Sequence, residues 1–221
     1  RLARAADSLG ATAVRCDVRN DGDVAALAAV AGELGGCDLL VQCAGASGGA
    51  SLETATDDDY RSALALNYLG LIRVFGALWP QLVERHGRIV NVVSVAGTVP
   101  LGRSAPYSCS KHAAIAWSRA LVAPARTHGV TVTTANPGPV PTPGFPQRGI
   151  VGHRLGGLVL IDAARCAAGI LHASDRGRAE VFLPARYRLP AAIQGVAPGL
   201  VARVLASPRF PRVGSGSPGT T

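Results

Sequence analysis

The chain has 221 residues, of which 48% are hydrophobic and only 16% are charged. This composition predicts a single globular domain with a substantial core and excludes a disordered or fibrous chain. No charge-free apolar run is long enough for a membrane span, and no apolar signal segment follows Arg1, so a cytoplasmic protein is favoured. The cysteines and histidines are scattered without metal-ligand spacing, which predicts reduced thiols and no metal.

The formal net charge of +8 is unevenly distributed, because residues 146–221 contain 10 basic and only 3 acidic residues. Nucleic-acid binding is not expected, since the arginines are dispersed and few aromatic residues stand between them. Attraction of a small phosphate-bearing molecule explains the basic excess more simply. A peripheral contact with an anionic membrane surface stays open as an alternative.

The first part of the chain alternates helical and strand patterns. The alanine-rich residues 1–9 predict the last part of a helix that ends at Gly10, and residues 12–18 predict a strand. Residues 21–34 repeat apolar side chains at helical period, and residues 37–43 predict a second, buried strand. This rhythm predicts an α/β fold with a parallel sheet and right-handed crossovers.

The stretch Gly45-Ala46-Ser47-Gly48-Gly49 matches the G-x-S-x-G pattern of a hydrolase nucleophile elbow. That elbow requires a helix to begin directly after the serine, whereas the next helical pattern begins only at Thr56. A glycine-rich binding loop is therefore favoured over a hydrolase, in which Ser47 would be the nucleophile.

A long helix is predicted from Thr56, which forms a capping box with three aspartates in the first turn. An apolar stripe follows at spacings of three and four, and Asn67 interrupts it. A buried amide is costly unless it is hydrogen-bonded, so Asn67 is either a functional residue or a surface position on a helix of different phase.

Ser94, Tyr107 and Lys111 form the strongest chemical pattern. Residues 88–94 predict a buried strand that ends at Ser94, and a helix from Ala105 places Tyr107 and Lys111 on one face. Lys111 is the only lysine in the chain. A nearby ammonium lowers the pKa of a phenol, and a serine hydroxyl can hold a substrate oxygen beside it, so the trio predicts proton transfer at an alcohol or carbonyl oxygen.

The rest of the chain predicts a strand at 130–135, an irregular loop at 136–157, a helix at 162–173 and a strand at 179–183. Pro124 is expected to break or kink the preceding helix near Ala123. Residues 190–205 form a proline-interrupted amphipathic segment, and residues 207–221 predict a disordered tail. We therefore expect a single domain over residues 1–206, with a substrate loop and variable part at 136–206.

These features resemble the classical type of the short-chain dehydrogenase/reductase family. The resemblance rests on Ser94 with Tyr107-x-x-x-Lys111 and on the Ser-Val-Ala-Gly of residues 94–97. It implies a Rossmann-type doubly wound parallel sheet, NAD or NADP as cofactor, and hydride transfer between that cofactor and a small alcohol or ketone. Tyr107 would be the general acid and base, and the apolar C-terminal part favours an apolar substrate.

The resemblance also implies roles for further residues. Asn67 would hold a water that links Lys111 to solvent, which completes the catalytic set of Asn67, Ser94, Tyr107 and Lys111. The cofactor would contact Asp17, Val18, Cys43, Ala44, Gly45, Tyr107, Lys111, Pro137, Gly138, Val140 and Thr142. Gln42 and Cys43 stand where the family usually has two asparagines, which puts their hydrogen bonds in doubt.

Members of the family begin with a βαβ unit that carries a glycine-rich turn, and no such unit precedes residue 1. We therefore expect an N-terminally truncated chain that binds dinucleotide poorly and is inactive alone, with an exposed edge on the strand at 37–43. The alternative is a catalytically silent sensor or interaction protein on the same scaffold. By resemblance, a homodimer or homotetramer would form through the helices at 57–79 and 105–123.

Overall fold

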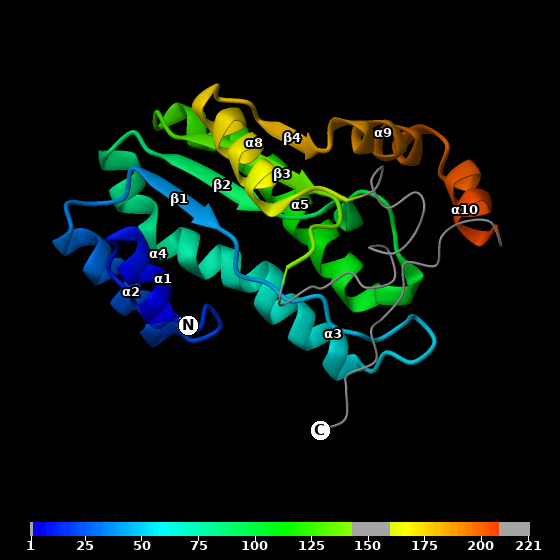
Figure 1. Cartoon of the computed structure of the whole chain (residues 1–221), viewed down its shortest axis with the longest axis horizontal. Helices are drawn as coiled ribbons and strands as arrows, with labels where there is room; N and C mark the ends of the chain where they lie inside the picture. Colours follow the sequence, from blue (N-terminus) through cyan, green and yellow to red (C-terminus); the bar gives the residue numbers. More distant parts are fainter. Residues whose placement is uncertain (1, 143–159, 208–221) are drawn as a thin grey trace.

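The computed structural model describes residues 2–142 and 160–207 of the chain. Its centre is a sheet of four parallel strands in the order in which they occur along the chain (Figure 1). The strands are β1 (Leu39–Gln42), β2 (Arg88–Val92), β3 (Thr131–Pro137) and β4 (Glu180–Leu183). Their carboxyl ends meet at one edge of the sheet, which is where open α/β sheets bind ligands.

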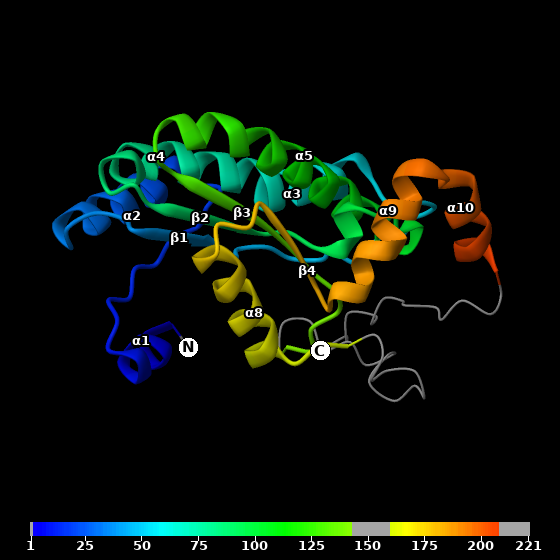
Figure 2. The same ribbon diagram turned by 90° about the horizontal axis from the view of Figure 1, so that it is seen from above.

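Helices cover both faces of the sheet (Figure 2). On one face lie α4 (Gly70–Glu84) and α5 (Ala105–Thr127), and on the other lies α8 (Ala163–Asp175). The remaining helices are α1 (Leu2–Leu9), α2 (Asp21–Glu33), α3 (Asp57–Leu64), α9 (Arg188–Val196) and α10 (Pro198–Ala206). Short helical turns occur at η1 (Ala65–Leu69), η2 (Val95–Gly97), η3 (Gly102–Ser104) and η4 (Ala185–Tyr187). This arrangement confirms the predicted α/β fold with a Rossmann-type parallel sheet.

The core has a cluster on each face of the sheet. On the α4 face, Leu82, Ile89 and Val130 are completely buried. On the α8 face, Val90 and Ile170 belong to a second cluster. Successive residues of β2 thus contribute to opposite clusters, because side chains alternate across a strand. This explains why β2 is apolar on both sides.

The strand predicted at residues 12–18 is wrong, because no strand is present there. A β-branched run forms a strand only when a neighbouring strand accepts and donates its backbone hydrogen bonds. Within the described residues the sheet begins at β1, which pairs only with β2. The side chain of Val41 in β1 is 43% exposed. Because β1 pairs on one side only, its other edge carries no strand in the described part of the chain, as expected from the sequence.

The long helix predicted from Thr56 forms with the expected cap. The backbone N–H of Asp59 donates to Thr56 Oγ1 at 3.3 Å, and the N–H of Thr56 donates to Asp59 Oδ2 at 2.9 Å. The helix then continues through α3, the π-helical turn η1 and α4. π-Helical turns occur often at functional sites, and this one contains Asn67.

The break predicted at Pro124 is wrong, because α5 continues through it to Thr127. Proline removes one backbone donor, and near the end of a helix this affects a single hydrogen bond. Ala125, directly beyond it, is completely buried, so packing holds the last turn in place. The other predicted strands and helices are present with ends shifted by a few residues, while predicted loop residues 143–157 and tail residues 208–221 lie outside the described part.

Within the described residues, one continuous helix, Asp57–Glu84, is long and apolar enough to cross a membrane by length and composition. The core helix of a soluble protein passes the same test. Leu78 and Leu82 of this helix are buried in the core cluster against the sheet. Packing against the sheet thus accounts for part of its apolar character.

Candidate active site

Ser94, Tyr107 and Lys111 converge at the carboxyl end of β2, as their spacing predicted. Ser94 lies two residues beyond β2, and the other two residues lie one turn apart at the start of α5. The Ser94 hydroxyl lies close enough to the Tyr107 hydroxyl to act on the pKa of the phenol, which it lowers. Lys111 Nζ lies 5.7 Å from the centroid of the Tyr107 ring. A hydroxyl, a phenol and an amine therefore share one site.

Gly97 sets how closely α5 approaches this site. A Cβ atom at position 97 would lie 2.5 Å from the backbone oxygen of Lys111 and 2.7 Å from Ile115 Cδ1. Both distances are shorter than van der Waals contact, so only glycine allows the helix to pack here. The glycine of the Ser-Val-Ala-Gly segment thus positions the helix that carries Tyr107 and Lys111.

Lys111 is buried, with 4% of its surface exposed, and its Nζ donates a hydrogen bond of 3.3 Å to the backbone oxygen of Val92. Burial lowers the pKa of its ammonium group to about 8, while the nearby Cys43 acts in the opposite direction. The charged form remains dominant near neutral pH but loses its proton at moderately alkaline pH.

The expectation that Lys111 lowers the pKa of Tyr107 is wrong for this site. Burial raises the pKa of the phenol, and the hydrogen bond from Ser94 offsets only part of this rise. The ammonium lies over the face of the ring and is itself desolvated, so it does not determine the direction of the shift. Tyr107 is therefore a protonated hydroxyl donor at neutral pH in this state.

The lowered pKa of Lys111 makes the stability of the protein depend on pH. An unfolded lysine keeps its proton up to about pH 10.5, whereas folded Lys111 loses it near pH 8. Between these values the unfolded state binds more protons, so the free energy of unfolding should rise with pH and should be independent of this group below about pH 8. The rise from Lys111 should amount to about 3 kcal/mol.

Urea denaturation of the chain and of Lys111→Met across this pH range measures the effect. Other titrating groups cancel in the difference between the two proteins. The stability advantage of the methionine variant at pH 7.5 should shrink as the pH rises towards about 10.5. A difference that is constant with pH would show that the ammonium group is not destabilised by burial.

Asn67 is completely buried and links two parts of the site. Its Oδ1 accepts a hydrogen bond from the backbone N–H of Ala46 at 2.9 Å, and its Nδ2 donates to the Ala46 oxygen and to Ser110 Oγ at 3.0 and 3.1 Å. Ser110 Oγ in turn donates to the backbone oxygen of Tyr107 at 2.7 Å. The reading of Asn67 as a surface position is thus wrong, and the loop after β1 is tied to the first turn of α5.

A second buried polar chain, which the sequence analysis did not identify, crosses the sheet towards α5. Gln42 Nε2 donates to Asn91 Oδ1 at 3.0 Å, Asn91 Nδ2 donates to Ser118 Oγ at 2.8 Å, and Ser118 Oγ lies 2.7 Å from Thr134 Oγ1. All four side chains are buried. The available signal was a polar residue, Asn91, inside an otherwise apolar strand pattern. The chain fixes the position of α5 on three strands.

Ser118→Ala should therefore destabilise the protein by about 2 kcal/mol, because it leaves buried groups of Asn91 and Thr134 without a partner. The free energy of unfolding in urea measures this loss. Ser8→Ala is a matched control, since Ser8 is an exposed helical serine that bonds only the backbone oxygen of Ala5. The control should change stability by less than about 0.5 kcal/mol. Equal effects of the two substitutions would contradict the positioning role of the chain.

The residues predicted to contact the cofactor near β1 lie in two places. Gly45 adjoins the catalytic residues, since a Cβ there would lie 2.8 Å from Asn67 Oδ1 and 3.5 Å from Lys111 Nζ. A groove of about 200 Å³ runs beside the open side of β1, and Val18, Cys43 and Ala44 line it.

Asp17, which was also predicted to contact the cofactor, is paired with Arg19. Arg19 Nη2 lies 2.6 Å from Asp17 Oδ2, and hydrogen bonds from Arg19 lower the pKa of this carboxyl to about 2. Its carboxylate is thus already paired.

The loop that contains Ser47 does not form a nucleophile elbow. No helix follows Ser47 before α3, and the backbone oxygen of Ser47 accepts a hydrogen bond from Ser104 Oγ at 3.4 Å. An elbow requires a strand, the serine and a helix in immediate succession. The geometry favours a binding loop.

The predicted cofactor residues after β3 have largely structural contacts. Gly138 packs against the Tyr187 ring, where a Cβ would lie 2.3 Å from a ring carbon, and its N–H donates to the Leu183 oxygen at 2.8 Å. Val140 packs against the α8 core cluster. Pro137 ends β3, and Thr142 is the last described residue before the gap. All four residues therefore lie on the carboxyl side of the sheet.

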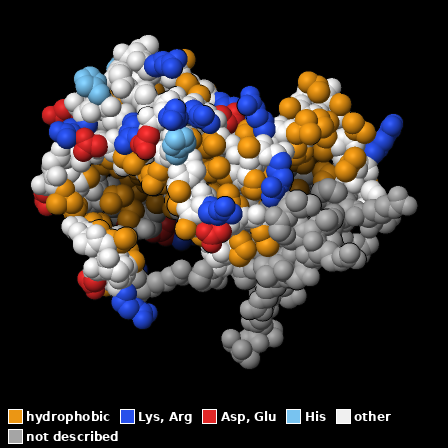
Figure 3. Space-filling model, turned by 45° about the horizontal axis from the view of Figure 1, so that its top comes forward, with side chains coloured by type: hydrophobic (Ala, Val, Ile, Leu, Met, Phe, Trp, Pro, Cys, Tyr) orange, Lys and Arg blue, Asp and Glu red, His pale blue; other side chains and the backbone are white. Residues whose placement is uncertain are grey.

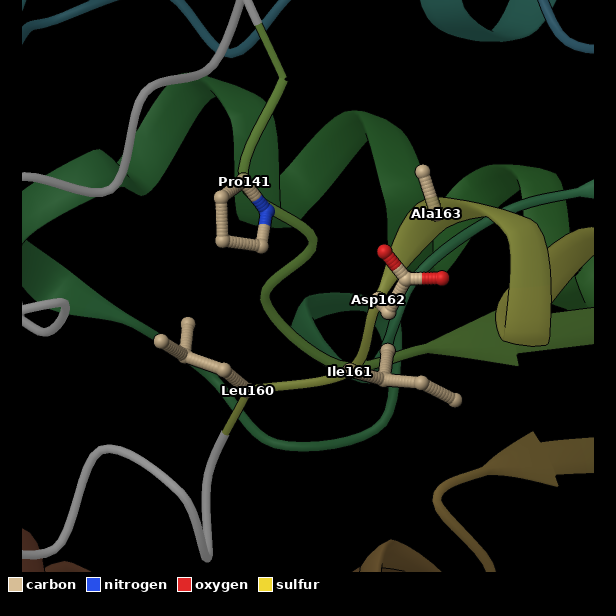
Figure 4. Close-up of a pocket in the computed structure, with 5 residues that line it drawn as sticks. All are labelled: Pro141, Leu160, Ile161, Asp162 and Ala163. Carbon is tan, nitrogen blue, oxygen red and sulfur yellow. The ribbon is translucent and has the colours of Figure 1, made fainter.

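A pocket opens between this segment and the start of α8 (Figure 4). The residues that line it are Pro141, Leu160, Ile161, Asp162 and Ala163. Asp162 caps α8, because its Oδ1 accepts hydrogen bonds from the N–H groups of Ala164 and Arg165. The remaining lining residues are apolar, so the pocket offers an apolar wall on the carboxyl side of β3.

The fold and the trio define an α/β protein of the Rossmann type with a Ser-Tyr-Lys site at the carboxyl end of its sheet. The short chain dehydrogenase family matches residues 1–149, more than half of the chain. The chain therefore belongs to the short-chain dehydrogenase family, which confirms the family predicted from the sequence.

Relatives agree with this assignment. An L-fucose dehydrogenase of Oryctolagus cuniculus is 33% identical over 61% of this chain and 48% of its own length. The short-chain reductase protein NovJ of Streptomyces niveus is 35% identical over 72% of this chain and 61% of its own. A short chain dehydrogenase from Burkholderia cenocepacia, solved in complex with NADP, superimposes with a TM-score of 0.76 at 26% identity and covers 88% of this chain and 78% of that one. The chain spans about half the length of the curated relatives it matches.

Proposed function

We propose that the protein transfers a hydride between NAD or NADP and an alcohol or carbonyl compound, with Tyr107 as general acid and base. The observation that carries this proposal is that Tyr107 lies beside both the Ser94 hydroxyl, which acts to lower the pKa of the phenol, and Lys111 Nζ, which is 5.7 Å from the Tyr107 ring centroid. The cofactor, when bound, supplies or accepts the hydride. The protein residues handle the proton and the substrate oxygen.

In the proposed mechanism, Ser94 donates a hydrogen bond to the substrate oxygen and holds it beside Tyr107. The protonated phenol then gives its proton to a carbonyl oxygen during reduction, and the phenolate takes a proton from an alcohol during oxidation. Lys111 is charged at neutral pH and lies 5.7 Å from the Tyr107 ring centroid, where it would position the cofactor rather than set the pKa of the phenol. In this proposal Tyr107 alone transfers the proton, and Ser94 and Lys111 position the groups that react.

We further propose that the nicotinamide half of the cofactor binds beside Gly45 and Lys111, which adjoin one another. The Lys111 ammonium is buried and has three donors, while its backbone contact to Val92 uses one of them, so it fits the hydroxyl groups of a ribose. Asn67 would hold the relay water at its Oδ1, because both of its amide hydrogens are already donated to Ala46 and Ser110. The segment from Pro137 to Thr142 would adjoin the nicotinamide.

The pyrophosphate half of the cofactor does not fit the described residues. Binding there requires a glycine-rich turn and a helix N-terminus at the carboxyl end of a strand, and the open side of β1 carries no such unit. We therefore propose that activity requires an additional parallel strand beside β1, seated in the groove lined by Val18, Leu40 and Ala44. The chain alone should then bind dinucleotide weakly.

The direct test compares this chain with the extended chain, which is a version lengthened upstream in its own reading frame. NAD(H) and NADP(H) binding and turnover are measured with a panel of alcohols and ketones that includes apolar compounds and polyols. Turnover by the extended chain alone supports the proposal, and a preference for apolar compounds would agree with the pocket at Leu160 and Ile161. Cofactor binding without any turnover would favour a silent sensor on the same scaffold.

We also propose a cytoplasmic homodimer or homotetramer that pairs through α4 and α5. Support comes from a partly buried aromatic group on these helices, in which Phe75 lies 5.0 Å from Trp79 and 5.3 Å from Trp117 between ring centroids. Aromatic residues are enriched in protein interfaces. The molar mass from light scattering distinguishes these states from a monomer.

A further inference from the structure

The helices α9 and α10 expose large apolar side chains to solvent. The exposed fractions are 67% for Leu189, 85% for Val196, 54% for Leu200 and 49% for Val204. These residues lie within two consecutive helices of nine residues each. Exposed apolar residues that gather in one place mark an interaction surface more often than isolated ones do.

The two helices form a bent projection at one end of the molecule. The chain bends by 118° between Ala185–Val196 and Pro198–Ala206, and α10 lies beyond the end of the sheet in both ribbon views (Figures 1 and 2). Only Val201 of these helices is buried. Figure 3 shows apolar side chains gathered over this end of the molecule, with basic side chains beside them.

The charge around this surface has one sign. The sequence contains no acidic residue after Glu180, and the described part beyond it exposes Arg186, Arg188 and Arg203. Glu180 itself is paired with Arg119, since its Oε1 lies 2.7 Å from Arg119 Nη2. Along the described residues after Glu180, the apolar side chains are therefore accompanied by positive charge alone.

We propose that α9 and α10 bind the surface of a membrane that contains anionic phospholipids. Leu189, Val196 and Leu200 would enter the boundary between headgroups and acyl chains, and the arginines would contact lipid phosphates. Each helix is only about 14 Å long, too short to span a bilayer alone, and the bend of 118° between them favours interfacial binding over a span. A second copy of the chain fits less well, because it would bring arginines against arginines. The proposal does not depend on the proposed function.

Vesicle flotation with the full chain tests this surface. Vesicles of phosphatidylcholine mixed with phosphatidylglycerol should bind the protein, vesicles of phosphatidylcholine alone should bind it more weakly, and added salt should reduce the difference. Leu189→Asp should weaken binding by about tenfold or more, and Arg188→Gln should weaken it by about fivefold.

Two matched variants control for non-specific effects. Leu34→Asp changes a leucine that is also 67% exposed but lies at the end of α2, and Arg126→Gln removes an exposed arginine at the end of α5. Neither should change vesicle binding, and unchanged thermal unfolding shows that the variants fold. The proposal is overturned if no vesicle binds the chain, or if Leu189→Asp and Leu34→Asp bind alike. A dimer that Leu189→Asp dissociates, without vesicle binding, would overturn it in favour of a second copy.

Discussion

Tyr107→Phe should lower turnover by the extended chain about 1000-fold, because it removes the hydroxyl that we propose exchanges a proton with the substrate oxygen. The phenyl ring is retained, so packing around it should be unchanged. The phenol is protonated at neutral pH in this state, since burial raises its pKa. The loss should therefore appear as a lower kcat in reduction as well as in oxidation.

The measurement is steady-state oxidation and reduction, followed by the absorbance of the reduced nicotinamide. Binding of NAD(H) or NADP(H) should stay within about twofold, because an interaction needed only for proton transfer affects the transition state and not the cofactor complex. Tyr60→Phe provides the matched control, since Tyr60 lies in α3 and is not one of the proposed catalytic residues. If Tyr107→Phe kept most of the activity, another residue would have to be the acid and base.

Gly97→Ala should destabilise the protein by about 3 kcal/mol and should also impair the site. The added methyl group would lie 2.5 Å from the backbone oxygen of Lys111, which cannot move without shifting α5. The substitution therefore couples stability to catalysis, because the same helix carries Tyr107 and Lys111. Urea denaturation and turnover by the extended chain measure the two effects.

Gly76→Ala is the control for this prediction. Gly76 lies within α4, and a Cβ there would meet no atom within 4 Å. Alanine in a helix interior is favoured over glycine, so this substitution should raise the free energy of unfolding by about 0.5–1 kcal/mol. The free energy of unfolding should therefore fall in Gly97→Ala and rise in Gly76→Ala. A stabilised Gly97→Ala variant would show that α5 can retreat from η2 at little cost.

Local signals predicted much of the fold. The capping box at Thr56 placed the start of α3, and the β-branched run after Gly87 placed β2, because both patterns act within a few residues. The strand predicted at residues 12–18 failed for a different reason, since a strand also needs a hydrogen-bonded neighbour that is distant in sequence. The helix break predicted at Pro124 was wrong for a similar reason. The last turn of α5 is held by the packing of Ala125, which the local sequence does not show.

The residues of the candidate site were predicted from the sequence, but the direction of the Tyr107 pKa shift was not. Spacing alone placed Ser94, Tyr107 and Lys111 together. The direction of the Tyr107 pKa shift depends on how burial compares with the distance to the ammonium, which only the structure supplies. The links through Ser110 and Ser118 were missed, because a helical serine gives no sign of which distant backbone or side-chain group it will bond.

Because Lys111 is buried, proteolysis at this residue measures how often the catalytic helix opens. Lysine-specific proteases have one cleavage site in the chain, after Lys111, because no other lysine is present. With 4% of this residue exposed in a buried turn of α5, cleavage requires that turn to open. The rate at which the chain is cut into two fragments therefore follows local unfolding of the catalytic helix, and a ligand that occupies the site would slow it.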